Sequence, residues 1–244
     1  MRAASSVLDA APARARPNDR AFYTGMAVAA ALAVLLGFSR TYYLRPYFQT
    51  TPLDTAFRVH GFVFSAWIAL FVAQTSLVAA RRTAIHRKLG WAGACLAVLM
   101  VVVALNAAVH GAQRDIAAGQ AQEALAFFST PVLSIATFAT LVAVAVALRG
   151  RAETHKRLML LATLSLLDAA AARMPIPGIE SNPLGYYAVT DACILAAMIY
   201  DFVSRRSVSP VYLYGGFAIV AEQWARDALG ATALWHAFAT SILG

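Results

Sequence analysis

Long apolar runs, separated by short clusters of charged residues, dominate the pattern of this chain. Seven windows are predominantly apolar over about 20 residues, the length that a helix needs to cross a hydrocarbon core of roughly 30 Å. The windows cover residues 22–40, 59–80, 90–110, 125–148, 157–175, 186–204 and 210–229. The pattern predicts an all-α fold, an integral membrane bundle of about seven transmembrane helices.

The two ends of the chain do not fit a membrane span. Residues 1–21 are rich in Ala, Pro and Arg and have no apolar period, so we expect a mobile basic tail. The apolar run that follows is long and no small-residue cleavage site closes it, which argues against a signal peptide. Residues 231–244 are apolar but too short to span, and they predict an interfacial helix or an extension of the last span. The transmembrane domain is therefore expected over residues 22–230.

The composition supports a membrane environment and excludes several soluble classes. Hydrophobic residues make up 60% of the chain and charged residues only 13%, whereas soluble domains have about 25% charged residues. Both cysteines, Cys95 and Cys193, lie in apolar stretches, so a disulfide framework and a four-cysteine zinc site are excluded. The net charge of +8 comes from Lys and Arg between the apolar runs, so we expect contact with lipid and none with nucleic acid.

The positions of the basic residues predict the orientation, because cytoplasmic loops of membrane proteins are enriched in Lys and Arg. With a cytoplasmic N-terminus, 14 of the 20 basic residues fall on the inner side. They are Arg2, Arg14, Arg16, Arg20, Arg81, Arg82, Arg87, Lys88, Arg149, Arg151, Lys156, Arg157, Arg205 and Arg206. We expect a multi-pass protein of the bacterial inner membrane, with its N-terminus inside and its C-terminus outside.

Two histidines open parallel spans in similar phrases. His86 begins IHRKLG and His155 begins THKRLM, and each is followed by two cationic residues at the inner entrance of a span. Because both spans run in the same direction, the two rings are expected at similar depth, facing each other across a planar cofactor. Imidazole is the usual axial ligand of b-type haem. The alternative is that both belong to basic loops that contact lipid phosphates.

Two further histidines are expected in the outer leaflet. A spacing of seven places His60, Trp67 and Gln74 on one helical face, which suits the bundle interior. The alternative is an interfacial histidine with a packing Trp and a Gln that bonds a neighbouring helix. His110 ends the third span at a depth similar to that of His60, and His236 could replace it. With the inner pair, this arrangement is the one that a two-haem transmembrane electron carrier needs.

Acids and arginines inside the spans form a second group of candidates, because a charge in hydrocarbon costs a few kcal/mol or more. Arg173 and Asp191 are expected as an ion pair between spans five and six, and Glu222 can pair with Arg226 four residues later. Asp168 has no local partner, so it either meets another helix or stays protonated. Asp168 is therefore the candidate for catalytic, proton-handling or substrate-binding work.

Several chemistries lack their motifs. The sequence contains no HxxxH or HxxH box of a di-iron membrane enzyme and no HExxH of a zinc protease. A retinal Schiff base is excluded because no Lys lies inside a predicted span. A Gly-rich phosphate loop is missing too.

Two stretches resemble elements of an uncharacterised family of bacterial multi-span membrane proteins, a domain of unknown function. HGFVFSAWIALFVAQTSLVAARRTAIHRKLGWAG matches its His, Gln, HRxxG element, and THKRLMLLATLSLLDAAAARM resembles its HRxWM to Arg element. The likeness covers roughly residues 58–175. The matching positions are His60, Gln74, His86, Gly90, His155, Met159 and Arg173, while Leu158 replaces the expected Trp. The resemblance implies a helical membrane bundle and no definite activity. A fainter likeness to transmembrane b-type cytochromes rests on the paired histidines and HRKLG, although the spacing differs.

Three functions stay open. The leading hypothesis is an integral membrane protein whose histidines hold haem b or a metal for redox or cofactor handling. The second is a non-enzymatic carrier, assembly or scaffold subunit, associated with other membrane subunits, in which the acids and arginines are structural. The third is a membrane-embedded enzyme that acts on a lipid or isoprenoid.

The orientation is testable with reporter fusions along the chain. Fusions at Ala84 and Ala152 should report the cytoplasm, and fusions at Ala117 and Ser181 the outer face, because the basic loops stay inside. The activity of a reporter that works on one side only provides the measurement. An outer location for Ala152 would overturn the assignment of the spans.

Overall fold

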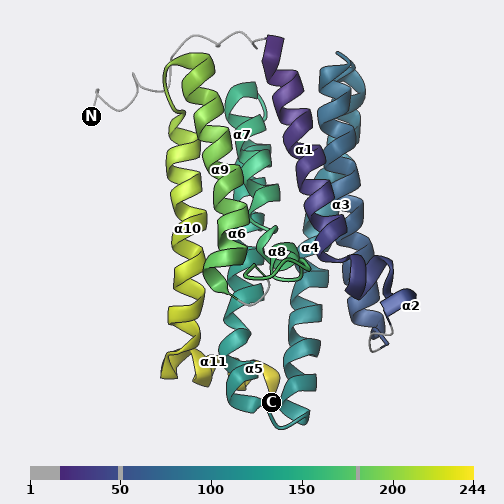
Figure 1. Cartoon of the computed structure of the whole chain (residues 1–244), viewed down its shortest axis with the longest axis vertical. Coiled ribbons are helices and arrows are strands. Elements are labelled where there is room, and N and C mark those ends of the chain that lie inside the picture. The colour runs from purple at the N-terminus through teal and green to yellow at the C-terminus, as the bar shows by residue number, and fades with distance from the viewer. Residues whose placement is uncertain (1–16, 49–51, 180–181) are drawn as a thin grey trace.

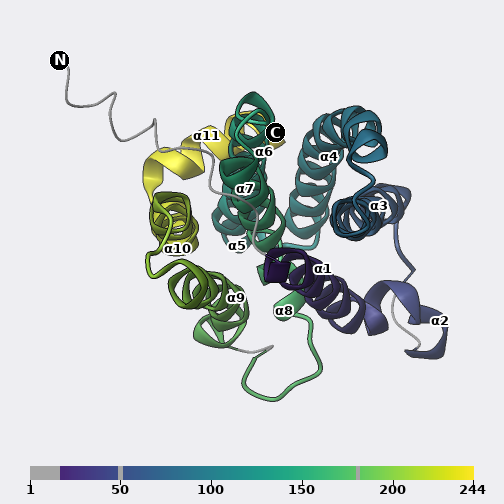
Figure 2. The same cartoon turned by 90° about the horizontal axis from the view of Figure 1, so that it is seen from above.

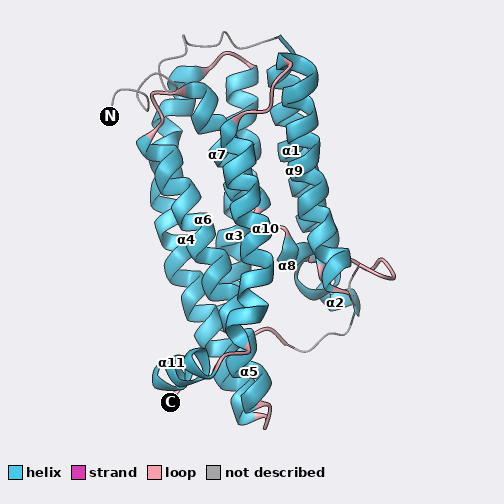
Figure 3. Ribbon diagram, turned by 90° about the vertical axis from the view of Figure 1, so that its left-hand side faces the viewer, coloured by secondary structure: helices cyan, strands magenta, loops and turns pink. Residues whose placement is uncertain are grey.

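The computed structural model describes residues 17–48, 52–179 and 182–244, and within these ranges all regular structure is helical (Figure 3). The helices are α1 (Pro17–Gly37), the π-helix η1 (Ser39–Tyr43), α2 (Arg45–Phe48), α3 (Thr55–Ala79), α4 (Thr83–Ala117), α5 (Ala121–Phe127), α6 (Ser129–Ala147), α7 (Ala152–Leu164), α8 (Asp168–Ala171), α9 (Pro183–Arg205), α10 (Pro210–Gly230) and α11 (Ala233–Leu243). The all-α prediction is confirmed.

The long helices run side by side along the long axis of the molecule (Figure 1). The start of α1 and the turns α3–α4, α6–α7 and α9–α10 lie at one end, which we call the basic end. On or beside its turns are Arg81, Arg82, Arg149, Arg151, Arg205 and Arg206. The basic turns that the sequence assigned to one side of the membrane therefore share one end of the bundle, while Arg2, Arg14 and Arg16 lie outside the described residues.

Five helical segments are long and apolar enough to cross a membrane, among the residues that the structure describes. They are Asn18–Gly37, Thr55–Ala79, Thr83–Ala117, Ala121–Ala147 and Pro183–Arg205. Helix α10 has similar length but carries Glu222, Arg226 and Asp227, and α7 has only 13 residues. The apolar character of the predicted bundle is thus confirmed for five segments, and α7 and α10 bury charged residues together with apolar ones.

The fifth predicted span, residues 157–175, is not one continuous helix. Helix α7 ends at Leu164 and the single turn α8 begins only at Asp168. In between, the Ser165 hydroxyl donates to the carbonyl of Ala162 at 2.9 Å, and the next two amides bond to carbonyls three residues back. Such side-chain and short-turn hydrogen bonds bend and end helices. The break ends the regular helix before it has crossed the bundle.

Helix α7 is the central element of the bundle, as the view from above shows (Figure 2). It packs against α1, α6, α9 and α10. Its residues Leu160, Leu161, Ala162, Thr163 and Leu164 are fully buried. This part of the fifth predicted span therefore lies in the core of the bundle.

The expected boundaries of both flanking segments change. Helix α1 begins at Pro17, so residues 17–21 of the expected tail are helical, while residues 1–16 lie outside the described part. At the other end, α11 is a helix separate from α10. Its N-cap Thr232 accepts a hydrogen bond from the amide of Trp235 at 3.2 Å, and the Trp235 indole donates to the carbonyl of Leu125 in α5 at 2.8 Å. Of the two expectations for residues 231–244, extension of the last span is the wrong one.

The close approach of α1 to α8 is testable at Gly37. A methyl group at Gly37 would overlap the backbone oxygen of Ala170, whereas nothing lies within 4 Å of one at Gly25 in the same helix. Overpacking costs about 1–3 kcal/mol, so Gly37→Ala should lower the melting temperature in detergent by several degrees. Gly25→Ala, the matched control, should be neutral or stabilising. Equal melting temperatures for the two variants would contradict this packing.

Candidate functional site

One polar cluster, the basic-end cluster, joins four helices just inside the basic end. Its members are Asp19 of α1, Glu153, Lys156 and Arg157 of α7, and Asp201 and Arg205 of α9. The backbone amide of Ser209, at the start of α10, also donates to Asp201. Three acids face three bases, so the cluster is neutral as a set. This balance allows the charges to be buried together.

The strongest pair of the basic-end cluster is Arg157 with Asp201. The Arg157 guanidinium donates to both oxygens of Asp201, at 2.7 and 3.0 Å, and both side chains are almost completely buried. Lys156, the preceding residue, reaches Asp19 of α1 at 2.8 Å. Sequence reasoning placed Arg157 and Lys156 in a basic loop and missed their acidic partners. The spacing of Glu153 and Arg157 at i, i+4 was the available signal.

A second polar cluster, the mid-bundle cluster, surrounds the break between α7 and α8. It comprises Asp168, Ser134 of α6, Tyr187, Thr190 and Asp191 of α9, and Glu222, Gln223 and Arg226 of α10. Asp168 therefore meets another helix, one of its two expected fates. Its carboxylate accepts from Arg226 at 2.6 Å and from the Thr190 hydroxyl.

Arg226 organises the mid-bundle cluster. Besides Asp168, it donates to Ser134 at 2.9 Å and to the Tyr187 hydroxyl at 3.3 Å. The predicted i, i+4 contact with Glu222 is present at 3.7 Å. Arg226 is nearly fully buried, so its charge depends on these partners.

The expected ion pair of Arg173 with Asp191 is wrong. Arg173 donates to the carbonyl of Ala169 at 2.6 Å and lies over the ring of Phe38, while Asp191 accepts from Gln223 at 3.2 Å. The expectation assumed two adjacent antiparallel helices that place both residues at one depth. Because α8 lasts a single turn, Arg173 follows it in a non-helical segment instead.

Two acceptor atoms of the mid-bundle cluster are buried without a hydrogen-bond partner among the described residues. They are Glu222 Oε2 and Gln223 Oε1. Buried polar atoms are normally hydrogen-bonded, and an unpaired one costs about 1–3 kcal/mol. The mid-bundle cluster is thus short of donors, unlike the basic-end cluster.

The two inner histidines lie close together at the same end of the bundle, at the similar depth that the sequence predicts. The ring centroids of His86 and His155 are 6.4 Å apart and the ring planes are inclined at 76°. His86 lies in the first turn of α4 and His155 in the first turn of α7, and both side chains are partly buried. The inner pair is therefore assembled at the basic end.

Each ring of the inner pair has a partner for its Nδ1 atom. His155 Nδ1 lies 2.8 Å from the carbonyl oxygen of Ala145, so it donates and leaves the Nε2 lone pair free. Gln74 of α3 lies beside His86: with the amide oriented to satisfy both groups, its nitrogen donates to His86 Nδ1 at 2.8 Å and its oxygen accepts from the Gly90 amide at 3.1 Å. Both histidines are held by a neighbouring element.

The face of α3 that carries the seven-residue spacing points inward, as expected. The buried Trp67 donates to Thr163 of the central helix at 3.3 Å, and Gln74 reaches α4. His60 stacks on Phe64 of its own helix with centroids 4.1 Å apart, and its Nδ1 is buried without a partner among the described residues. His60 is thus placed in the interior, where its ring also hydrogen-bonds the backbone of Val103 in α4.

The outer histidines do not form a comparable pair. His110 lies 3.1 Å from Asp54 and both are well exposed, whereas His60 stacks on Phe64. His236 Nε2 approaches the carbonyl of Gly230 at 2.8 Å in the α10–α11 turn. Within the described ranges, no group of three or more His, Cys, Asp or Glu could hold a metal ion. The inner pair is the remaining candidate for a ligand set.

Comparison of the chain with models of protein families, with characterised proteins and with solved structures gave no match. The resemblances suggested by the sequence therefore stay predictions, and function has to be argued from the geometry.

The pairing of Asp168 with Arg226 is testable by a double-mutant cycle. Removing one partner of a buried ion pair costs about 3–5 kcal/mol, so Asp168→Asn and Arg226→Leu should each lower stability in detergent. The double variant should lose clearly less than the sum, because neither charge is then left alone. Arg173→Ala with Asp191→Ala should be additive. Additive losses for Asp168 and Arg226 as well would show that they do not interact in the membrane protein.

Proposed function

We propose that this chain is an integral membrane protein that binds one b-type haem for electron transfer, with His86 and His155 as the axial ligands. The observation that carries the proposal is the placement of the two rings, 6.4 Å apart at the ends of α4 and α7. Residues far apart in the chain are brought together here, and each ring is anchored by another element.

The ring separation fits two imidazoles on one metal ion. A ring nitrogen lies about 1.2 Å from the ring centre and a metal–nitrogen bond is about 2 Å long, so two opposed ligands have centroids roughly 6 Å apart. The observed centroid separation of 6.4 Å is of this size, with the ring planes inclined at 76°. Two residues alone make a poor site for a bare metal ion, which usually takes four or more ligands. A planar cofactor that supplies the remaining ligands resolves this shortage.

The hydrogen bond of His155 supports ligation through Nε2. A ligating histidine typically donates its other ring N–H to a carbonyl or carboxylate, and His155 does so to Ala145. His86 would need the same protonation at Nδ1. The Gln74 amide instead donates to His86 Nδ1 and accepts from the Gly90 amide, so ligation through Nε2 of His86 would require this amide to turn over and give up its bond with Gly90.

The charges around the inner pair suit the two carboxylates of haem b. Arg87 and Lys88 follow His86 directly, and Lys156 and Arg157 follow His155. Lys156 and Arg157 are engaged with acids, whereas Arg87 and Lys88 are exposed. Bound there by His86 and His155, haem would supply one-electron redox chemistry.

The proposal includes the topology that the basic residues favour. The N-terminus and the basic end lie in the cytoplasm of a bacterium, the C-terminus lies outside, and α7–α8 and α10 complete seven membrane segments. This places the haem near the inner face of the membrane. One haem is proposed instead of two, because His60 and His110 have separate partners.

A non-enzymatic carrier or scaffold is the rival supported by a specific observation. Asp168, the candidate catalytic residue, is engaged by Arg226, Thr190 and Gln223, as a structural carboxylate would be. In that case the inner pair would be two loop histidines that contact lipid phosphates. The visible spectrum of the purified protein separates the two functions.

The haem proposal predicts a Soret band in protein purified from a haem-producing host. His86→Ala or His155→Ala should reduce bound haem at least tenfold while the folded protein remains in the membrane, because each removes an axial ligand. His236→Ala, which alters a histidine in the α10–α11 turn, is the matched control and should keep the band. A colourless parent protein that also fails to take up added hemin would refute the proposal.

Gln74 provides a second readout within the same experiment. Gln74→Glu places a full negative charge beside His86 Nδ1 and should lower the reduction potential of the haem, because a more basic ligand favours the oxidised metal. Gln74→Leu removes the acceptor and should shift the potential in the opposite direction. Identical potentials for both variants would exclude Gln74 as the partner of a ligand.

A further inference from the structure

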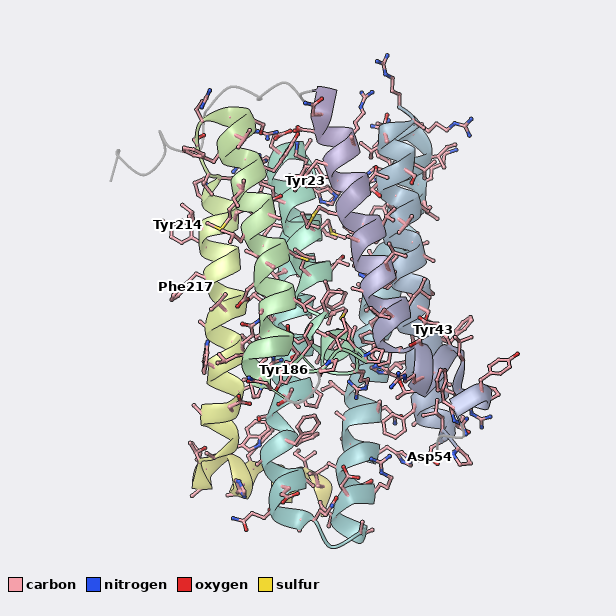
Figure 4. All side chains as sticks on the ribbon, viewed as in Figure 1. Tyr23, Tyr43, Asp54, Tyr186, Tyr214 and Phe217 are labelled. Atoms are coloured by element: carbon pink, nitrogen blue, oxygen red, sulfur yellow. The ribbon has the colours of Figure 1, made fainter. Side chains whose placement is uncertain are left out.

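An apolar groove runs along the outside of the bundle between α9 and α10. It has a volume of about 580 Å³ and is lined by Leu195, Met198, Leu213, Phe217 and Val220, among others. Its rim is open to the surroundings: 73% of the Phe217 surface is exposed, and Figure 4 shows this ring pointing away from the bundle. Gly216 lies in the lining, where a methyl group would come within 2.9 Å of Ile194. Because Gly216 has no side chain, the floor of the groove stays open at this position.

A single charged side chain, Asp191, belongs to this lining. Its Oδ1 accepts from the amide of Gln223 at 3.2 Å, and its Oδ2 accepts no hydrogen bond from the residues that the structure describes. Asp191 lies eight residues after the start of α9, about 12 Å along the helix axis. A carboxylate at this depth beside an apolar groove needs a hydrogen-bond donor from elsewhere.

Gln223, the side chain that donates to Asp191, does not line the groove, and it also lacks a donor. Gln223 is fully buried, and its Oε1 has no partner among the described residues. Its amide nitrogen is already committed to Asp191 and Asp168. The polar end of the groove therefore offers an acceptor, Asp191 Oδ2, that receives no hydrogen bond from the described residues.

The charge of the surrounding mid-bundle cluster restricts what the groove can hold. Asp168, Asp191 and Glu222 lie around one base, Arg226, so an anionic head group would be repelled. A phospholipid head would in addition stay at the membrane surface, away from Asp191. A neutral head that donates a hydrogen bond meets both requirements, and the apolar lining suits a hydrocarbon chain.

We infer that the α9–α10 groove binds a single-chain lipid alcohol drawn from the bilayer. The hydroxyl donates to Asp191, and the chain follows the groove toward Met198 and Leu213, in the direction of the basic end. The volume is within the range of small-ligand sites, about 300–1,000 Å³. The inference does not depend on haem, because neither α9 nor α10 contributes to the inner pair.

Trp224 provides a reporter at the polar end of the groove. It follows Leu213 by eleven residues, which returns to the same face of α10 within about 20°, and 56% of its surface is exposed. Bromine quenches indole fluorescence on contact. The experiment titrates the purified full chain in nanodiscs with 2-bromododecan-1-ol and, separately, with 2-bromododecanoic acid and a phosphatidylcholine brominated on its acyl chain.

The alcohol should quench saturably, and the acid at neutral pH should need at least tenfold higher concentration, because its carboxylate meets Asp191. Trp224→Phe should abolish the saturable component, which assigns it to the groove. Asp191→Leu should weaken binding about tenfold or more by removing the acceptor. Ala192→Phe fills the groove beside Asp191 and should also weaken binding of the alcohol about tenfold or more. Leu32→Phe, on the exposed side of α1, is the control and should leave this binding unchanged.

Equal saturable quenching by all three brominated lipids would show a nonspecific lipid surface and overturn the inference. Unchanged saturable quenching by the alcohol in Asp191→Leu would also overturn the inference. Saturable quenching that persists in Trp224→Phe would overturn it as well. The melting temperature of each variant shows whether the fold is intact. Because Asp191 and Ala192 lie beside a groove open to the bilayer, their variants are expected to fold, and a loss of binding can then be assigned to the groove.

Discussion

Buried ion pairs at both ends of the central segment hold this bundle together. The α7–α8 segment carries Arg157 near one end and Asp168 near the other, and each is almost fully buried. Their partners, Asp201 of α9 and Arg226 of α10, come from neighbouring helices. An unpaired charge in this interior would cost several kcal/mol. The helices around α7 can therefore associate in only a few ways, because both charges must meet their partners at once.

The same constraint fixes the rotation of α7 about its axis and so the direction of His155. Consecutive helical residues point about 100° apart. Arg157 is held by α9 and Lys156 by α1, so the preceding residue, His155, is turned toward α6 and α4. Its contact with the carbonyl of Ala145 and its approach to His86 follow from this rotation. The proposed cofactor site is thus positioned by ion pairs that take no part in ligation.

What the sequence could predict depends on whether the signal is local. Apolar length, the basic turns, the inward face of Trp67 and Gln74, and the i, i+4 contact of Glu222 with Arg226 all follow from helical periodicity or composition. The similar depth of the two inner histidines followed from one further argument, that parallel spans place equivalent residues at equal depth. These predictions need no knowledge of which helices are neighbours.

The predictions that were wrong or missing depend on which helices are neighbours in space. The pairing of Arg173 with Asp191 assumed which helix surfaces meet, and the break after Leu164 invalidated that assumption. The basic-end cluster was missed because its acids come from α1 and α9, far along the chain from Arg157. Asp19 was even assigned to a tail. No periodicity within one segment carries information of this kind.

The balance of charge separates the two polar clusters by role. Three acids and three bases of the basic-end cluster neutralise one another, so it can be buried without any further partner. The mid-bundle cluster contains three acids and one base, Arg226, and two of its buried acceptor atoms have no donor within the described part of the chain. Burial raises the free energy of each uncompensated carboxylate until it binds a proton or meets a donor. The first cluster is therefore complete as a structural clamp, and it is the second, beside the α9–α10 groove, that requires something from outside the chain.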